Sequence, residues 1–388
     1  MPDLLTLARH GRFGLEEGRA WITVQGTALL ELMHAASALR DEGKGRTVTY
    51  SRKVFIPLTT YCRDDCGYCT FKHDPGHPGA KTLSPDEVLA IARLGGARGC
   101  KEALFSLGDK PELRFPEAAA ALERFGHRTT TDYLADMAGR VLEDTGLLPH
   151  VNPGTLSKAE LARLRDCSPS MGVMLENLAP RLREPGMAHE RAPDKAPGAR
   201  LAMLRFAGEL RIPFTTGLLV GIGEAPAERA DTLWEIRRLH ERHGHIQEVI
   251  VQNFRAKPGI PMAGWPDATL TDLLRTIAVA RLMLGSAMNI QAPPNLSPEA
   301  YPLLLLAGIN DWGGVSPVTP DHINPEAPWP EIQVLARRSA EVGYTLRERL
   351  TVYPEYVVQP GWIAEALLDG VRHWADGEGY AIPAEKHG

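Results

Sequence analysis

The sequence lacks both an apolar run of membrane-spanning length and a block of basic residues. A spanning helix needs about 20 apolar residues, whereas the longest apolar stretches, at 214–222 and 303–309, have the length of a strand or a short helix. Lys and Arg number 43 against 48 Asp and Glu, so the net charge is −5. We therefore expect neither a membrane anchor nor a nucleic-acid partner.

Cysteine is scarce too, with five in 388 residues, and three of them lie between positions 62 and 69. An odd number in one tight group fits a metal site better than a framework of disulfides. The first 17 residues mix charges of both signs and have no apolar signal core. These features predict a cytoplasmic chain that binds a metal through its cysteines.

Short β-rich stretches alternate with amphipathic helical segments over most of the chain, which is typical of a parallel sheet built from βα units. Two helices begin with a capping box, Ser84 with Glu87 and Ser157 with Glu160. The predicted strands are 53–58, 103–107, 147–151, 171–175, 213–220 and 248–252, with weaker ones at 289–291 and 307–310.

No linker or change of composition interrupts these units, so the α/β pattern favours one (β/α) TIM-type barrel, complete or partial, over residues 46–325. A doubly wound sheet is the alternative. Residues 1–45 are expected to form a helical N-terminal extension, and residues 326–388 a C-terminal extension that packs on the barrel. Polar and glycine-rich clusters follow the strands, where barrel enzymes place their active sites.

Cys62, Cys66 and Cys69 follow the first predicted strand with the spacing C-x3-C-x2-C. Three thiolates suit an iron–sulfur cluster or zinc. With His73 they could instead form a Cys3His zinc site, as in a zinc-dependent barrel hydrolase. Three ligands to a four-iron cluster leave one iron open for catalysis.

A fourth thiolate would change this interpretation, because a cluster with four protein ligands transfers electrons and leaves no iron open. Cys100 and Cys167 are the two candidates for that ligand. Cys100 lies at the start of the second predicted strand, at the opposite end of the barrel from the cysteine loop, and is more simply a small core residue.

The cysteine motif, with Tyr68 before its third cysteine, resembles the signature of the radical S-adenosylmethionine (SAM) enzymes. The resemblance implies that Cys62, Cys66 and Cys69 bind a [4Fe–4S] cluster. It also implies that SAM binds the open iron and is cleaved to methionine and a 5′-deoxyadenosyl radical, chemistry that belongs to the cofactors.

Further SAM contacts follow from the same resemblance. Residues 217–224 resemble the fifth-strand glycine motif that lies along the adenine, although a tight βα turn explains the same glycines. Glu176 is placed like the acidic residue that binds the ribose or amino group, with a solvated loop carboxylate as the alternative. Residues 107–112 depart from the usual Gly-Gly-Glu. The expected cofactor-binding residues are Tyr68, Gly108, Asp109, Glu176, Gly217, Gly221 and Gly223.

From residue 50 to 360 the chain resembles the CofG-type subunit of 7,8-didemethyl-8-hydroxy-5-deazariboflavin synthase, in the free-standing form. The segments that carry the likeness are 55–59, 62–71, 107–112, 149–154, 213–224, 252–259, 309–320 and 350–355. A CofH-like or biotin-synthase-like enzyme is the nearest alternative.

That resemblance implies the ring-closing step of coenzyme F-420 biosynthesis, in which 5-amino-5-(4-hydroxybenzyl)-6-(D-ribitylimino)-5,6-dihydrouracil is converted to the deazaflavin with release of ammonia. A CofH-type radical SAM partner supplies this adduct, and a low-potential donor supplies electrons. The polar ribityl and uracil groups call for hydrogen-bonding side chains. The loop-end candidates are His150, Asn152, Asn253, Arg255, Asn310, Asp311 and Asp321.

Overall fold

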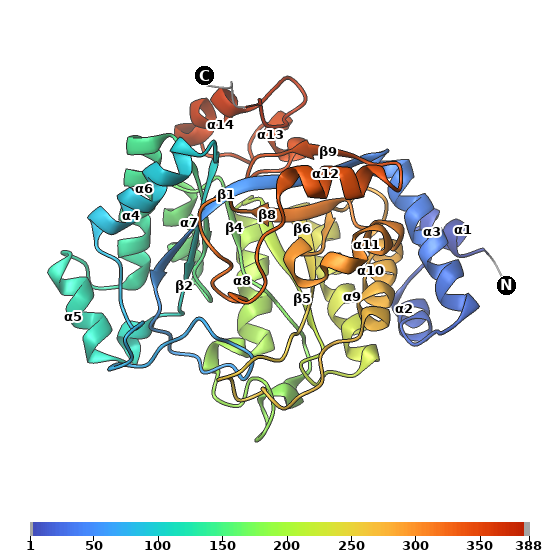
Figure 1. The fold of residues 1–388 in the computed structure, drawn as a ribbon, viewed down its shortest axis with the longest axis horizontal. Helices are drawn as coiled ribbons and strands as arrows, with labels where there is room; N and C mark the ends of the chain where they lie inside the picture. The colour runs from blue at the N-terminus through green and yellow to red at the C-terminus, as the bar shows by residue number, and fades with distance from the viewer. Residues whose placement is uncertain (1–2, 384–388) are drawn as a thin grey trace.

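Eight parallel strands close into a complete barrel in the computed structural model, which describes residues 3–383 (Figure 1). The order runs from β2 to β8 and then β1, and β1 pairs with β2 to close the ring. The strands are β1 (Thr47–Thr59), β2 (Glu102–Leu107), β3 (Leu148–Asn152), β4 (Ser170–Gly172), β5 (Phe214–Val220), β6 (Ile246–Asn253), β7 (Ile290–Gln291) and β8 (Asp311–Val315). The barrel prediction is confirmed in its complete form, and the doubly wound alternative is wrong.

Helices surround the barrel and bury their apolar faces against the sheet. Both predicted capping boxes are present, at the starts of α4 and α7. The outer helices are α4 (Pro85–Ala97), α5 (Pro116–Arg124), α6 (Thr130–Thr145), α7 (Lys158–Arg165), α8 (Pro197–Glu209), α9 (Pro226–His243), α10 (Leu270–Leu284) and α11 (Tyr301–Leu306).

The segments before and after the barrel form additional helices and one more strand that pack on its outside. The N-terminal helices α1 (Leu4–Arg9), α2 (Leu15–Trp21) and α3 (Thr27–Lys44) pack beside α9 and α10. After the barrel come α12 (Ile332–Ala340), a ninth strand β9 (Thr345–Glu348), α13 (Pro354–Val358) and α14 (Leu368–Trp374).

β9 lies outside the barrel and pairs with the start of β1. The chain that follows β9 packs on Leu148, at the beginning of β3. This C-terminal segment therefore covers the end of the barrel where the strands begin.

Three strand predictions need correction, the first being that β1 begins at Thr47 and not at residue 53. Residues 307–310 form no strand, because the apolar run at 303–309 continues from α11 into a turn and β8 begins only at Asp311. β4 is shorter than the predicted 171–175 and ends at Gly172.

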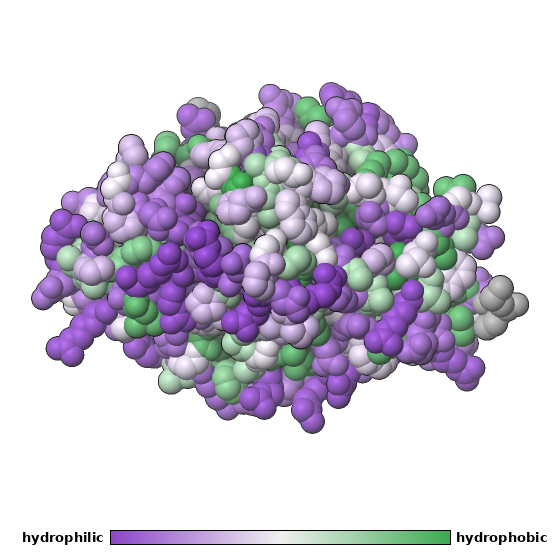
Figure 2. Space-filling view, turned by 90° about the horizontal axis from the view of Figure 1, so that it is seen from below, coloured by the Kyte–Doolittle hydropathy of each residue, from purple (hydrophilic) through white to green (hydrophobic). Residues whose placement is uncertain are grey.

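The loops that follow the strands lie at the bottom of Figure 1 and form the largely hydrophilic face of Figure 2. Within the described residues, no helix combines the length and the apolar character needed to cross a bilayer.

Candidate active site

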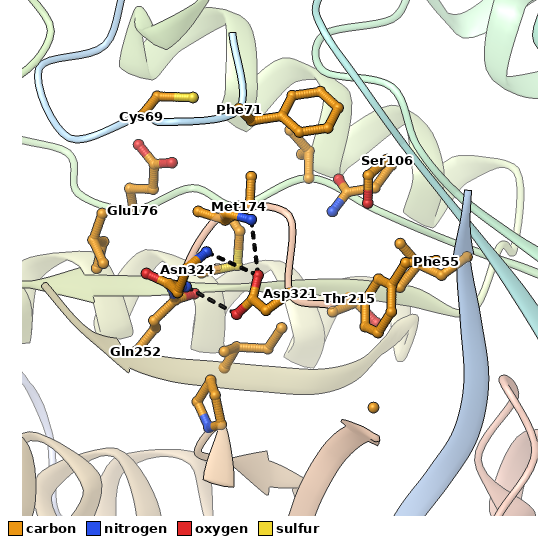
Figure 3. A pocket seen from close by; sticks show the side chains of 18 of the residues that line it. Phe55, Cys69, Phe71, Ser106, Met174, Glu176, Thr215, Gln252, Asp321 and Asn324 are labelled. Carbon is orange, nitrogen blue, oxygen red and sulfur yellow. Dashed lines mark hydrogen bonds between the residues drawn. The ribbon is translucent and has the colours of Figure 1, made fainter. Parts of the chain in front are cut away.

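A cavity of about 350 Å³ lies inside the barrel and opens toward these loops. Each strand, or the segment directly after it, contributes lining side chains. Figure 3 shows Cys69 and Glu176 at one end of the cavity, with Phe55 and Thr215 on the opposite side. The barrel therefore brings residues far apart in the sequence around one space.

Cys62, Cys66 and Cys69 all line this cavity, on the loop between β1 and α4. The loop is held in place by Gly67, whose N–H donates to the carbonyl of Ala188 at 2.7 Å. Burial raises the pKa of Cys62 to about 12 and that of Cys66 well above its usual value. Thiols so buried become ligands only when a metal supplies compensating positive charge, so this donor set fits an iron–sulfur cluster.

The zinc alternative has no geometric support. His73 stacks on His77 with ring centroids 4.1 Å apart and does not line the cavity. Zinc ligands lie about 2.0–2.3 Å from the ion and hence within about 4 Å of one another. The three thiols are not that close together. Among residues 3–383, the set of three metal-ligating groups that lie within 4.8 Å of one another consists of carboxylates.

That carboxylate group consists of Asp64, Asp109 and Asp194, all buried beside the cysteine loop. Arg63 compensates part of its charge, because its Nε donates to Asp194 Oδ2 at 2.7 Å. The Thr155 hydroxyl donates to Asp194 and to Asp109, at 3.1 Å in both cases. The cluster is thus tied into the wall of the cavity.

The other two cysteines lie outside the cavity. Cys100 is buried just before β2, at the far end of the barrel. Cys167 follows α7, and its thiol contacts the carbonyl of Leu164 at 3.4 Å. The four-cysteine alternative therefore has no support in the geometry.

Glu176 lines the cavity at the end where Cys69 lies and is buried. The alternative of a solvated loop carboxylate is therefore wrong. Its carboxylate accepts hydrogen bonds from Tyr68 Oη at 2.5 Å and Lys195 Nζ at 2.5 Å, and it lies 3.0 Å from His189 Nε2. Burial alone would raise the pKa of Glu176, but the Lys195 ammonium and His189 outweigh it and hold that pKa well below its usual range. The side chain is a fixed anion beside the cysteines.

Gly108 and Asp109 also line the cavity next to Cys62. A Cβ at Gly108 would lie 1.9 Å from the carbonyl oxygen of Tyr61, so no side chain fits there. Asp109 is buried, and its Oδ1 has no hydrogen-bond partner. Burial and the neighbouring Asp194 raise the pKa of Asp109 to about 7. An amino group of a ligand would satisfy the free oxygen.

The three glycines of the motif at 217–224 do not line the cavity, because Gly217 lies within β5 and Gly221 and Gly223 form the turn that follows it. A Cβ at Gly217 would lie 2.1 Å from the carbonyl oxygen of Ile250 on β6. Gly221 and Gly223 have φ of +97° and +101°, and the Glu224 carboxylate accepts the N–H of Gly221 at 2.8 Å. The geometry supports the turn explanation and brings none of these three glycines to the cavity surface.

Five of the seven substrate-pocket candidates line the cavity, namely His150, Asn152, Asn253, Arg255 and Asp321. Asn310 and Asp311 do not, because the late start of β8 places them at the end of the barrel opposite the loops. Asn310 Oδ1 accepts from Arg281 Nη2 at 2.8 Å, and Asp311 pairs with Arg349. Both are structural residues at the end of the barrel where the strands begin, which we call the floor.

Several residues that line the cavity belong to no recognisable sequence motif. Lys195 and Arg200 follow a long segment after β4, and Arg349 comes from the C-terminal segment. Gln252 also lines the cavity, and its position at the end of a predicted strand is a sequence signal for a loop-end site residue. Residues 316–331, which we call the roof, follow β8 and supply further lining side chains. Among them, Asp321 accepts a hydrogen bond from Asn324 Nδ2 at 3.0 Å (Figure 3).

A barrel with three cysteines on its first loop and a polar cavity is the arrangement of a radical SAM enzyme, and residues 56–236 match the sequence model of the Radical SAM superfamily. The chain is 53% identical over 334 residues to the 7,8-didemethyl-8-hydroxy-5-deazariboflavin synthase of Methanopyrus kandleri, covering 86% of this chain and 99% of that protein. The chain therefore belongs to the radical SAM superfamily and, within it, to the family of these synthases. The superfamily uses a [4Fe–4S] cluster and SAM, which confirms the cofactor prediction.

The FO synthase of Mycobacterium tuberculosis is also 53% identical, over 392 residues. That alignment covers 96% of this chain but 46% of the relative, so the chain spans about half its length. Two solved structures share the fold. The hydrogenase maturase HydG of Carboxydothermus hydrogenoformans superimposes with a TM-score of 0.71 at 18% identity, and the match covers 89% of this chain and 79% of that one. Methylornithine synthase superimposes with a TM-score of 0.68 at 21% identity, and the match covers 88% of this chain and 97% of that one.

Proposed function

We propose that this enzyme closes the deazaflavin ring. It converts 5-amino-5-(4-hydroxybenzyl)-6-(D-ribitylimino)-5,6-dihydrouracil to 7,8-didemethyl-8-hydroxy-5-deazariboflavin and releases ammonia, a carbon–nitrogen lyase step in coenzyme F-420 biosynthesis. The observation that carries the proposal is the cavity, which joins three cysteines and a buried anion to a polar interior. The match along nearly the whole length of the Methanopyrus kandleri enzyme supports it.

In this proposal Cys62, Cys66 and Cys69 would hold the cluster, and Asp109 and Glu176 would bind the amino and ribose groups of SAM. When bound, the two cofactors supply the hydrogen-abstracting 5′-deoxyadenosyl radical. The unpartnered Oδ1 of Asp109 fits an ammonium donor, and the fixed negative charge of Glu176 fits hydroxyl donors.

The remaining lining residues position the substrate and exclude water. Phe55 of β1 stacks on Trp329 of the roof with ring centroids 5.3 Å apart and planes 5° apart. This aromatic wall keeps solvent from a reactive intermediate, which is one task of a closed active site. Asn152 and Asn253 offer carboxamides that can hydrogen-bond a uracil edge.

A turnover assay tests the reaction. Supplied anaerobically with a strong one-electron reductant, SAM and the adduct, the enzyme should form 5′-deoxyadenosine, methionine, ammonia and the fluorescent deazaflavin. Tyrosine and ribityl-diaminouracil alone should give no product, because the CofH-type partner that makes the adduct is absent. Formation of the adduct by this chain would assign it the partner activity. Cleavage of SAM with neither compound consumed would point to another substrate, as in a biotin-synthase-like enzyme.

Metal analysis tests the ligands separately. Cys66→Ser should lose iron and acid-labile sulfide, whereas Cys100→Ser and Cys167→Ser should keep both, because these two thiols lie outside the cavity. Equal loss of iron in Cys100→Ser would mean four protein ligands and no open iron. Zinc without sulfide in the wild-type protein would restore the hydrolase alternative.

A further inference from the structure

The floor of the cavity is polar, which is unusual inside a barrel of this type, where branched apolar side chains normally fill the centre. Lys53, Glu102, Thr215 and Glu248 line it from β1, β2, β5 and β6. Lys53 precedes Thr59, the last residue of β1, by six positions, or about 20 Å at ~3.3 Å per residue. This polar layer thus lies well below the cysteine loop.

The charges in the layer are paired with one another. Lys53 Nζ lies 2.7 Å from Glu102 Oε1. Arg349 donates to Asp311 Oδ2 at 2.6 Å and to Glu248 Oε1 at 3.2 Å. Among the described lining residues of this layer, each cation therefore has a carboxylate partner. A ligand group that enters meets hydrogen-bonding atoms but no free positive charge.

His150 adds a neutral group to the layer. Burial lowers its pKa to about 4, so the ring is uncharged at neutral pH. Its Nδ1 lies 2.7 Å from the Ser170 hydroxyl, which in turn lies 2.6 Å from the hydroxyl of Thr351. The surroundings therefore suit an uncharged polar ligand.

Gln291 of β7 places its carboxamide in this layer, and no side-chain hydrogen bond joins that carboxamide to any residue between 3 and 383, although the residue is only 7% exposed. A carboxamide that faces the cavity without a protein partner is available to hydrogen-bond a ligand. Gly313 makes room for it, because a Cβ there would lie 2.1 Å from Gln291 Nε2. A Cβ at Gly314 would lie 2.2 Å from Lys53 Cε. The glycine pair of β8 thus shapes the space for both side chains.

We propose that Gln291 is a specificity-determining residue that hydrogen-bonds an uncharged polyhydroxylated chain of the substrate, the ribityl chain of the adduct. The inference rests on the proposed function, since that substrate carries such a chain. A hydroxyl group donates and accepts, and a carboxamide does the same. The reacting carbon must lie near Cys69 and Glu176, so the rest of the substrate extends toward Thr215 and the floor (Figure 3).

The same layer should reject a phosphorylated chain. A phosphate would face the carboxylates of Glu102 and Glu248 while Lys53 and Arg349 are already paired with them. Desolvating a dianion without a free cation is strongly unfavourable. The enzyme should therefore act on the dephosphorylated compound only.

The test compares three adducts, carrying a ribityl chain, an ethyl group in its place, or a ribityl 5′-phosphate. The wild-type enzyme should prefer ribityl over ethyl by about 10- to 100-fold in kcat/KM. Gln291→Leu should lose about tenfold with the ribityl adduct, mainly through KM, and nothing with the ethyl adduct. Gln291→Asn keeps the carboxamide on a shorter side chain and should lose less. Gln333→Leu, on the exposed face of α12, is the control variant.

An equal loss of Gln291→Leu with the ribityl and ethyl adducts would overturn the inference, as would efficient use of the 5′-phosphate. SAM affinity reports whether the variants are folded. Equilibrium dialysis of the ribityl adduct without reductant separates the inference from the proposed function. If Gln291→Leu weakens that binding but the wild type forms no deazaflavin, the inference stands and the proposed function fails. If deazaflavin forms but the enzyme shows no preference for the ribityl adduct over the ethyl adduct, the proposed function stands and the inference about Gln291 fails.

Discussion

Glu176 carries a single negative charge whose partners come from distant positions in the chain. Its backbone φ is +62°, a conformation that costs a non-glycine residue about 1–3 kcal/mol. Lys195, 19 positions downstream, and Tyr68, 108 positions upstream, hold the carboxylate in place. A strained residue that is held by its surroundings is typical of a functional site.

Replacing this carboxylate tests its part in cofactor binding. Glu176→Gln keeps the shape but removes the charge, so SAM affinity should fall about ten- to hundredfold, the equivalent of roughly 1.5–3 kcal/mol for a charge-assisted hydrogen bond. Anaerobic equilibrium dialysis measures this, with iron content unchanged. Glu184→Gln, an exposed position after the same strand, should have no effect. An unchanged dissociation constant in Glu176→Gln would remove this residue from the SAM site.

His245 should make the protein sensitive to acid. It is fully buried, and neither ring nitrogen has a hydrogen-bond partner. Burial lowers its pKa to about 3, below the value of ~6.5 in the unfolded chain. The unfolded state therefore takes up the proton first, and stability falls as the pH drops from about 6.5 toward 3. At pH 5 this loss amounts to about 2 kcal/mol, at 1.36 kcal/mol per pH unit.

His245→Phe, beside Phe214, should remove that loss. The difference in unfolding free energy between pH 7.5 and pH 5 should shrink by about 2 kcal/mol, as measured by urea unfolding under anaerobic conditions. The exposed variant His10→Gln should leave the difference as in the wild type. An identical pH dependence in His245→Phe would show that the ring is not buried as a neutral group.

Residues that belong to a local motif could be predicted from the sequence, and residues that act through three-dimensional assembly could not. Cys62 and Asp109 follow strands with strong local signals, and both line the cavity. Gln291 and Arg349 have no such signal, because they reach the cavity only once the barrel closes. Asp311 does not line the cavity, because β8 begins at that residue and not at 307.

At the scale of elements, strand boundaries were the weak point for a physical reason. β8 contains Gly313 and Gly314, which lower its strand propensity, so the sequence pattern favours the apolar run before it as the strand. β1 starts six residues earlier than predicted, because polar side chains such as Ser51 point into the barrel and hide the alternation. The helix starts were predicted correctly, since a capping box is local.

Arg349, directly after β9, joins the C-terminal segment to the floor of the barrel through two buried ion pairs, and their contribution to stability can be tested. Arg349→Met would leave Asp311 and Glu248 buried without their cation, at a cost of about 3–5 kcal/mol. Arg347→Met, two positions earlier, breaks only half-exposed pairs with Asp376 and Glu378, which are worth about 0–1 kcal/mol. Anaerobic urea unfolding should separate the two variants clearly. Equal effects would mean that the floor does not depend on Arg349.

At the scale of the whole molecule, the cavity is closed by segments that lie far apart along the chain. The roof segment 316–331 is tied to the cysteine loop, because Thr70 Oγ1 donates to the carbonyl of Ile323 at 2.6 Å. Lys257, after β6, donates to the same carbonyl at 2.6 Å and also to Asn324. The carbonyl oxygen of Ile323 in the roof thus accepts hydrogen bonds from both the cysteine loop and the segment after β6.

This joint should control how tightly SAM cleavage is coupled to product formation. Lys257→Met removes charge-assisted hydrogen bonds worth about 1.5–3 kcal/mol, so an opened roof should become about ten- to hundredfold more populated. Water and reductant then reach the reactive intermediate, and more 5′-deoxyadenosine should form per deazaflavin than in the wild type. Lys81→Met, an exposed lysine of the cysteine loop, is the control. An unchanged ratio in Lys257→Met, with iron content and SAM affinity preserved, would mean that the roof stays closed through its aromatic contact with Phe55 alone.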